Sequence, residues 1–350
     1  MQSNSCLNSS GHRRDSIMRI QRCQETLKDM YKDSNIFDDS NCDISSLNLS
    51  DVKAGSMIGK GTFGQIRSLT SLPNEISFTQ MSSGSSSSSM CNLEETEIRS
   101  DSRSDLPLPQ KYVLKEIRGS IANDCNEATF NAAAIDLVKE SRFLQLLSHH
   151  ENIIGFYCTG GCEGSRDFFI LIEKIEKTLD DLFFREWRHL QRNLNCIRVQ
   201  QYLKDQISIE HDLCKTPRRQ QKDATQKFLI LRLQVIVGIT SGLAFLHENN
   251  VLFRDLKPTN IGISSKGVPL IFDFGLAREL KSKDKVDEEG NYKLTGMVGT
   301  LRYMTPEVYR SNPYGLASDV YSLTMLLYEA LTLIKAVLFH ESFSFSKIGI

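Results

Sequence analysis

Hydrophobic and polar residues alternate in several short runs that begin near Met57. The runs are SMIGKGTFGQIRSL, KYVLKEI, IIGFYCTG and FFILIEKI, and they are rich in β-branched and aromatic residues, which is typical of strands. Between KYVLKEI and IIGFYCTG, apolar residues recur at helical spacing from Ala128 to Leu147. We therefore predict a strand-rich region that contains one long helix.

After Leu182 the apolar spacing is helical, and long helices are predicted over residues 228–249 and 319–333. Both segments are apolar enough to resemble membrane spans. Charged residues such as Arg232 and Glu329 lie inside them, however, and a charge near the middle of a span is costly. We expect buried core helices and no membrane span.

Three polar segments lack these patterns. Residues 1–50 are expected to be a weakly structured tail; the alternative is a docking helix, because apolar residues between Ile17 and Met30 share one helical face. Residues 68–110 contain SSGSSSSS and an acidic stretch, a composition that cannot bury enough apolar area to offset its chain entropy. We expect a disordered insertion there, and a second polar insertion over residues 185–226.

The length and charge of the chain set broad limits. Its 350 residues fit one large domain, or two lobes with unpacked segments. A formal net charge of −1 gives no argument for a nucleic-acid or membrane partner. The nine cysteines lack C-x-x-C spacing, and the first residues lack the apolar core of a signal peptide. We expect reduced thiols in an intracellular, cytoplasmic protein.

A glycine pattern lies between the first two predicted strands, at Gly59, Gly61 and Gly64. The pattern alone is weak, because G-x-G-x-x-G serves dinucleotide-binding folds as well as other nucleotide sites. A dinucleotide site needs these glycines to open a helix. Here residues 65–69 continue as a strand, so we predict a hairpin whose backbone N–H groups cover phosphates.

A lysine in the second predicted strand and a glutamate on the long helix form a candidate pair. A lysine in a strand is more often a surface residue whose charge reaches water, so Lys115 alone means little. Glu140 lies among apolar residues of the helix face that is directed toward the strands. We therefore predict that Lys115 pairs with Glu140.

The strongest chemical signal is the segment VLFRDLKPTN, followed by IFDFGLA. Asp255 can accept the proton of an attacking hydroxyl, and Lys257 can neutralise a transferring phosphoryl group. Asn260 and Asp273 supply the hard oxygen ligands that suit Mg²⁺. Because phosphoryl transfer needs these parts together, two unrelated polar loops are a poor alternative.

These motifs resemble those of the eukaryotic protein kinase family over about residues 57–333. The resemblance implies an α+β, bilobal fold, with a strand-rich N-lobe over residues 51–175 and a helical C-lobe over residues 176–350. It also implies ATP, Mg²⁺ and a protein substrate. Lys257, two residues after Asp255, is similar to Ser/Thr kinases rather than Tyr kinases, and DVYSL is similar to the tyrosine-kinase-like branch.

The resemblance assigns further residues by their position in the motifs. Around the adenine it places Ile58, Ile66, Val113, the gatekeeper Ile172 and the hinge residues Glu173 to Ile175; around the phosphates it places Gly59, Gly61, Gly64, Lys115, Glu140 and Asp273. Thr300 resembles the threonine that steadies the catalytic aspartate, and Asp319 resembles the buried aspartate that supports the catalytic loop. A phosphate on Thr295 could pair with Arg254, which implies an upstream kinase acting on the loop over residues 276–298; Ser282 and Tyr292 are alternative sites in this loop.

The sequence also departs from the family pattern. Phe253 replaces the usual histidine, in a hydrophobic stack expected to join Leu144, Phe156 and Phe274, and we expect the ring to preserve the packing. After about Leu333 the usual further helices, and the arginine expected to pair with Glu307, are missing from the sequence. We therefore expect a shortened C-lobe, and poor solubility and little activity when residues 1–350 are expressed alone.

Two other functions compete with an active kinase. An inactive, kinase-like scaffold that binds nucleotide is the first, but it would not need Lys115, Asp255, Asn260 and Asp273 together. A nucleotide-dependent oxidoreductase is the second, but it would require alternating strands and helices after the glycine pattern, which the sequence lacks.

Overall fold

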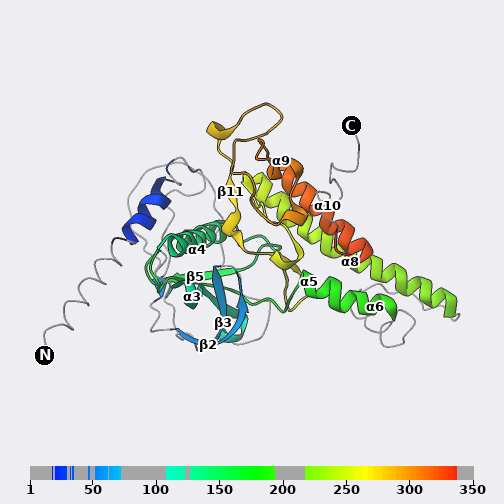
Figure 1. Cartoon of the computed structure of the whole chain (residues 1–350). Coiled ribbons are helices and arrows are strands. Elements are labelled where there is room, and N and C mark those ends of the chain that lie inside the picture. The colour runs from blue at the N-terminus through cyan, green and yellow to red at the C-terminus, as the bar shows by residue number, and fades with distance from the viewer. Residues whose placement is uncertain are drawn as a thin grey trace, which may run out of the picture. The chain divides into compact units, whose positions relative to one another are not determined.

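The structure, a computed structural model, describes residues 18, 20–29, 32, 34, 46–47, 52–61, 63–71, 108–122, 127–193 and 217–336. The chain divides into two compact units (Figure 1). The first unit comprises Met1–Tyr31, Phe37–Ser141 and Phe156–Lys174, and the second comprises Lys32–Ile36, Arg142–Gly155 and Ile175–Ile350. The α+β architecture predicted from the sequence is confirmed: strands dominate the first unit and helices the second.

A six-stranded sheet forms the first unit, in the order β1-β5-β6-β4-β3-β2. Its strands are β1 (Ser46–Leu47), β2 (Lys53–Lys60), β3 (Gly64–Ser71), β4 (Tyr112–Ile117), β5 (Phe156–Gly160) and β6 (Phe169–Glu173). Neighbours are antiparallel except β1 and β5, which are parallel. The helices are α2 (Leu108–Lys111), α3 (Gly119–Ala122) and α4 (Glu127–Leu147), the last of which continues into the second unit.

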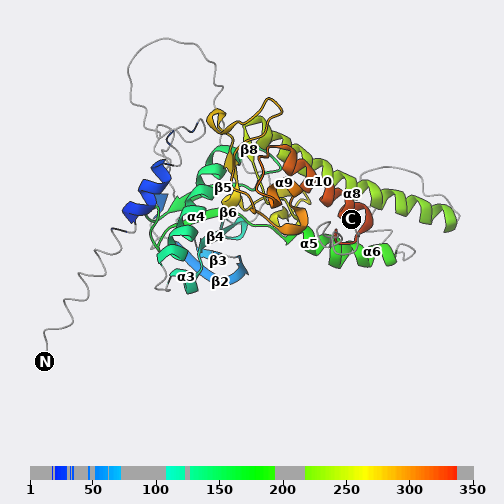
Figure 2. The same ribbon diagram turned by 45° about the horizontal axis from the view of Figure 1, so that its top comes forward.

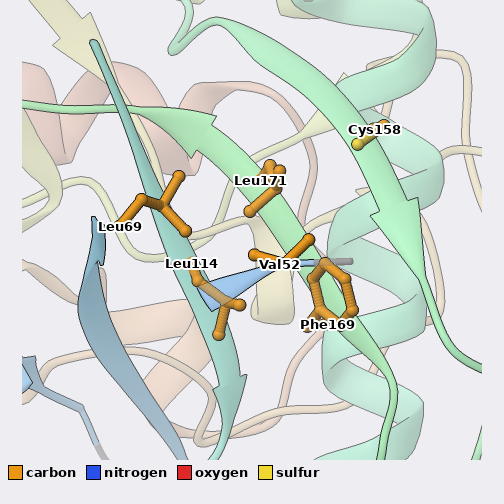
Figure 3. Packing of buried hydrophobic residues seen from close by; sticks show 6 residues of the cluster. All are labelled: Val52, Leu69, Leu114, Cys158, Phe169 and Leu171. Atoms are coloured by element: carbon orange, nitrogen blue, oxygen red, sulfur yellow. The ribbon is translucent and has the colours of Figure 1, made fainter. Parts of the chain in front are cut away.

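One face of this sheet carries an apolar cluster (Figure 3). Its members are Val52, Leu69, Leu114, Cys158, Phe169 and Leu171. Successive side chains of a strand point to opposite faces, so the complete burial of Leu114 on this face directs Lys115 to the other. The core of the sheet therefore fixes the face on which the charged residue of β4 lies.

The segment before the sheet differs from the predicted weakly structured tail. Residues 20–29 form a helix, and Cys23 and Leu27, four residues apart, are buried on one face of it. A Cβ built on Gly164 would lie 2.8 Å from Cβ of Cys23, so the turn between β5 and β6 needs glycine there. Arg22 also lies 3.6 Å from a carboxylate oxygen of Glu127. The helical pattern between Ile17 and Met30 therefore describes these residues better than a weakly structured tail does.

Helices of the second unit surround three short β ladders. The helical segments are α5 (Leu179–Asp181), η3 (Leu182–Trp187), α6 (Arg188–Arg192), α8 (Pro217–Glu248), η4 (Pro258–Asn260), η5 (Phe274–Leu276), η6 (Ser282–Asp284), η7 (Leu301–Tyr303), α9 (Pro306–Tyr309) and α10 (Ala317–Thr332). The strands are β7 (Lys177–Thr178), β8 (Val251–Leu252), β9 (Ile261–Ile263), β10 (Pro269–Ile271) and β11 (Arg278–Glu279). They pair in the orders β10-β9-β7 and β11-β8, with an isolated bridge from Ile153 to Ile271.

The two long helices of this unit, α8 and α10, lie side by side in both views (Figures 1 and 2). Within the described residues, one stretch of α8, Asp223–Glu248, is long and apolar enough to cross a membrane by length and composition alone, which is weak evidence for a span. Its Arg232 is buried and donates to the carbonyl oxygens of Ala330 and Leu331, each at 3.1 Å. This contact satisfies carbonyls at the end of α10.

The predicted insertions have different boundaries in the structure. Residues 68–71 belong to β3, because Leu69 contributes to the apolar cluster, and residues 72–107 lie outside the described residues. Within the predicted insertion 185–226, Trp187 is buried and its ring contacts Phe228 edge-on at 5.8 Å. The helix α8 starts at Pro217 rather than residue 228, since proline suits a first helical turn and the following Arg, Gln, Lys and Ala favour helix.

Candidate active site

The glycine pattern lies on a β-hairpin of the first unit. β2 and β3 pair with Gly59 opposite Ile66, and the N–H of Gly61 donates to the carbonyl of Gly64 at 2.9 Å. A Cβ on Gly64 would lie 3.3 Å from Cε of Lys115, tighter than most contacts. A strand therefore follows these glycines, which confirms the predicted hairpin and is not the strand-to-helix turn that a dinucleotide site requires.

The predicted ion pair of Lys115 and Glu140 is present. Nζ of Lys115, on β4, lies 2.5 Å from Oε2 of Glu140, on α4. The glutamate side chain is 3% exposed and the lysine side chain 13% exposed, so water screens the pair weakly. The register that places Ile66 opposite Lys115 sets the depth of the ammonium group beneath the hairpin.

The residues expected to surround an adenine lie in different environments. Ile58 is 52% exposed on β2, whereas Val113 on β4 and Ile172 on β6 are buried. Glu173 ends β6 opposite Tyr112. In the second unit, the side chain of Ile175 packs directly over Gly262, where any Cβ would overlap it. An exposed apolar side chain such as Ile58 is available to cover a flat ligand.

Three side chains converge on the carboxylate of Asp255 in the second unit. Thr300 donates from Oγ1 to Oδ1 at 2.7 Å, and Lys257 donates from Nζ to Oδ2 at 2.6 Å. Asn260 donates from Nδ2 to Oδ2 at 2.9 Å and to the Asp255 carbonyl at 3.0 Å. Lys257 also donates to Oγ1 of Thr300 at 2.9 Å. The structure thus brings together all four residues predicted to act in catalysis.

Asp319, at the start of α10, accepts hydrogen bonds from the backbone of the loop that carries Asp255. Oδ2 of Asp319 accepts from the N–H of Phe253 at 2.7 Å, and Oδ1 accepts from the N–H of Arg254 at 2.8 Å. Nε2 of His247 lies 3.1 Å from the same carboxylate. Arg254 has φ of 68°, a costly conformation for a non-glycine residue. The role predicted for Asp319 is therefore confirmed, whereas the contribution of His247 was not foreseen.

Asn260 and Asp273 are brought together by the β9–β10 hairpin. Ile261 pairs with Ile271, and the N–H of Phe272 donates to the carbonyl of Asn260 at 3.1 Å. The amide nitrogen of Asn260 is used by Asp255, which leaves the harder amide oxygen for a cation. Asp273 has φ of 71°, a left-handed conformation that is enriched at functional sites. This donor set fits Mg²⁺.

Aromatic rings pack beneath Asp273. The ring of Phe253 meets the ring of Phe274 edge-on at 5.2 Å, and both residues are fully buried. Phe143, which was expected on the apolar face of its helix but not in this stack, also contacts Phe274, with ring centroids 6.1 Å apart. The expectation that Phe253 preserves the packing is confirmed for its contact with Phe274.

Glu329, a buried acid, forms hydrogen bonds with the segment that follows Thr300. The hydroxyl of Tyr303 lies 3.0 Å from both carboxylate oxygens of Glu329 on α10, and the N–H of Ala336 donates to Oε1 at 2.8 Å. Burial raises the pKa of Glu329 and also that of Tyr303. The pairing of Tyr303 with Glu329 was not predicted from the sequence, because the two residues are 26 positions apart and no local pattern relates them.

Comparison with known proteins gives a family match. Residues 108–344 match the family described as protein kinase domain. The matched residues begin after the glycine hairpin. The evidence for the hairpin is therefore the pairing of β2 with β3 in the structure, and not the family match.

Individual proteins match over a shorter stretch. The chain is 38% identical over 99 residues to a probable serine/threonine-protein kinase PknB of Bifidobacterium longum, covering 28% of this chain and 14% of that protein. It is 40% identical over 94 residues to the serine/threonine-protein kinase AtPK1/AtPK6 of Arabidopsis thaliana, covering 27% and 18%. The chain thus matches less than a fifth of the length of these relatives.

Proposed function

We propose that this chain, which belongs to the protein kinase family, is a Ser/Thr protein kinase. It would transfer the γ-phosphoryl group of MgATP to a hydroxyl group of a protein substrate. The observation that carries this proposal is the carboxylate of Asp255, which is held by Lys257, Asn260 and Thr300. The names of the similar proteins from Bifidobacterium and Arabidopsis support the Ser/Thr class.

The residues of the first unit are suited to hold the nucleotide. Backbone N–H groups of the glycine hairpin cover the phosphates, and the Lys115 ammonium, fixed by Glu140, balances their charge. Ile58 and Ile66 of the same hairpin offer apolar surface to the adenine. The ion pair with Glu140 limits the rotamers of Lys115, so less entropy is lost when the phosphates bind.

The residues of the second unit are suited to the transfer itself. Asp255 accepts the proton of the substrate hydroxyl, and Thr300 fixes the orientation of its carboxylate. Lys257, which donates to the Asp255 carboxylate, would neutralise charge on the moving phosphoryl group. Asn260 and Asp273 would hold Mg²⁺, which supplies further neutralisation of the phosphate oxygens.

Phosphoamino-acid identity tests this proposal. The full chain is incubated with γ-labelled ATP, Mg²⁺ and a panel of basic and acidic protein substrates, and the products are sequenced by mass spectrometry. We expect phosphoserine or phosphothreonine, and no label when Mg²⁺ is chelated. A folded chain that binds ATP but labels no substrate and not itself would support the scaffold function instead, and phosphotyrosine alone would contradict the Ser/Thr class.

A further inference from the structure

The loop over residues 276–298 is structured in its middle, within the second unit. The N–H of Val286 donates to the carbonyl of Asn291 at 2.8 Å, and the N–H of Lys293 donates to the carbonyl of Asp284 at 2.7 Å. The side chain of Asp287 accepts from Asn291 at the turn. These contacts form a small hairpin inside the loop.

Tyr314, which follows α9, holds this hairpin by its backbone. The N–H of Tyr292 donates to the carbonyl of Tyr314 at 2.9 Å, and the N–H of Tyr314 donates to the carbonyl of Tyr292 at 3.2 Å. The next residue, Gly315, lies so close to the carbonyl oxygen of Gly290 that any Cβ would overlap it. The approach of the hairpin to this backbone therefore depends on glycine at position 315.

The ring of Tyr314 is anchored in an apolar cluster of the second unit. The residue is 1% exposed and packs with Leu252, Leu280, Met304 and Val308. A buried phenol needs a polar partner, because an unsatisfied hydroxyl costs free energy. The packing fixes where the hydroxyl lies.

The hydroxyl of Tyr314 joins the loop to the catalytic segment. It donates to the carbonyl of Thr295 at 2.7 Å and lies 3.4 Å from Nη1 of Arg254. The same nitrogen lies 3.4 Å from Oγ1 of Thr295, while Nε of Arg254 donates to the carbonyl of Leu276 at 2.6 Å. One phenol and one guanidinium thus connect both ends of the loop to the residue that precedes Asp255.

We propose that Tyr314 is a positioning residue that holds the loop in place when Thr295 carries no phosphate. The inference rests on the proposed kinase function. A phosphate or carboxylate at position 295 would bind Arg254 more strongly than the threonine hydroxyl does, because a charge-assisted hydrogen bond is the stronger one. The hydroxyl of Tyr314 and an anionic group at residue 295 can therefore each hold the loop against Arg254. When the hydroxyl is removed, the loop needs the anionic group to keep its position.

Tyr314→Phe tests the role of the hydroxyl, because the substitution keeps the ring and the backbone pairing. The full chain is treated with phosphatase, and the absence of phosphate on Thr295 is confirmed by mass spectrometry. We expect kcat to fall about tenfold while KM for ATP stays within about twofold, since the ATP-binding residues of the first unit are untouched. Amide hydrogen exchange should become faster in residues 285–298. Tyr328→Phe, which alters a half-exposed tyrosine of α10, is the matched control.

A second substitution separates positioning from general loss of structure. Adding Thr295→Glu to Tyr314→Phe should restore most of kcat and slow the exchange of residues 285–298. Unchanged kcat and exchange in Tyr314→Phe, or the absence of restoration by Thr295→Glu, would overturn the proposal. If the parent chain transfers no phosphate at all, the proposed function fails, and the exchange data alone still decide whether Tyr314 orders the loop.

Discussion

Asp255 owes its orientation to neighbours of different chemistry. The Thr300 hydroxyl and the Asn260 amide fix the plane of its carboxylate, whereas Lys257 places a positive charge beside it. These contacts set the direction in which the carboxylate faces, which is what a positioned base requires. Lys115 and Glu140 show the same principle in the first unit, where a half-buried ammonium group pairs with a buried carboxylate.

Breaking the Lys115–Glu140 pair should destabilise the chain as well as weaken ATP binding. Lys115→Met removes the ammonium from a glutamate whose side chain is 3% exposed, and we expect a loss of about 3–5 kcal/mol in the free energy of unfolding. Adding Glu140→Gln should recover part of this loss, because the remaining buried charge is removed. Urea unfolding of the parent, both single variants and the double variant measures the coupling. Strictly additive losses would show that the two charges do not stabilise each other.

Glu329 should make stability depend on pH. Its pKa in the folded chain is raised by burial, against the opposing effects of the Ala336 N–H and the Tyr303 hydroxyl, so the folded chain holds this proton more tightly than the unfolded chain does. The contribution of Glu329 to the free energy of unfolding therefore falls as pH rises from its ordinary pKa of 4.5 to the raised value. The Glu329→Gln variant has no ionisable group at this position, so its free energy of unfolding should not show this decrease.

Thermal melting of the parent and of Glu329→Gln over pH 4 to 8 measures the effect. We expect the melting temperature of the variant, relative to that of the parent, to increase with pH. A difference that stays constant or decreases with pH would show that burial does not raise the pKa of Glu329.

At the scale of elements, regular periodicity made the long segments predictable. Both α4 and α10 lie where the helical spacing of apolar residues placed them, and β4 and β6 lie where the apolar runs did. The two-residue strand β1 could not be predicted, because it has too few positions to show a period. The start of α8 was missed for another reason, since its first residues favour helix by propensity without an apolar face.

Among site residues, contacts were predictable where a motif or a shared face determined them. The Lys115–Glu140 pair followed from a strand position and a helix face, and the residues around Asp255 followed from one compact motif. The pairing of Tyr303 with Glu329 and that of Tyr292 with Tyr314 depend on how distant segments pack. No local pattern in the sequence records such packing.

The helix over residues 20–29 should contribute measurably to stability. Leu27 is 4% exposed, and Leu27→Ala removes buried methyl groups and leaves a cavity, so we expect a loss of roughly 2–5 kcal/mol in the free energy of unfolding. Met18→Ala, at a residue that is 49% exposed, is the control and should change stability by less than about 0.5 kcal/mol. Equal effects of the two substitutions in urea unfolding would show that the helix does not pack in solution.

At the scale of the whole molecule, the proposed chemistry is divided between two units. The first carries the glycine hairpin with Lys115 and Glu140, and the second carries Asp255 and its partners with Asn260 and Asp273. Lys115 and Glu140 pair within the first unit, and Asp255 contacts Lys257, Asn260 and Thr300 within the second. Binding of the nucleotide and transfer of its phosphoryl group should therefore respond separately to substitution.

Single-turnover phosphoryl transfer by Asp255→Asn, measured beside ATP binding by the same protein, tests the central claim most directly. We expect the transfer rate to fall by a factor on the order of 10² or more, because a positioned base is lost, while ATP affinity stays near that of the parent. Glu288→Gln, at a side chain that is 99% exposed, is the control and should leave both unchanged. A folded Asp255→Asn protein that transfers phosphate at the parental rate would contradict the assignment of Asp255 as the catalytic base.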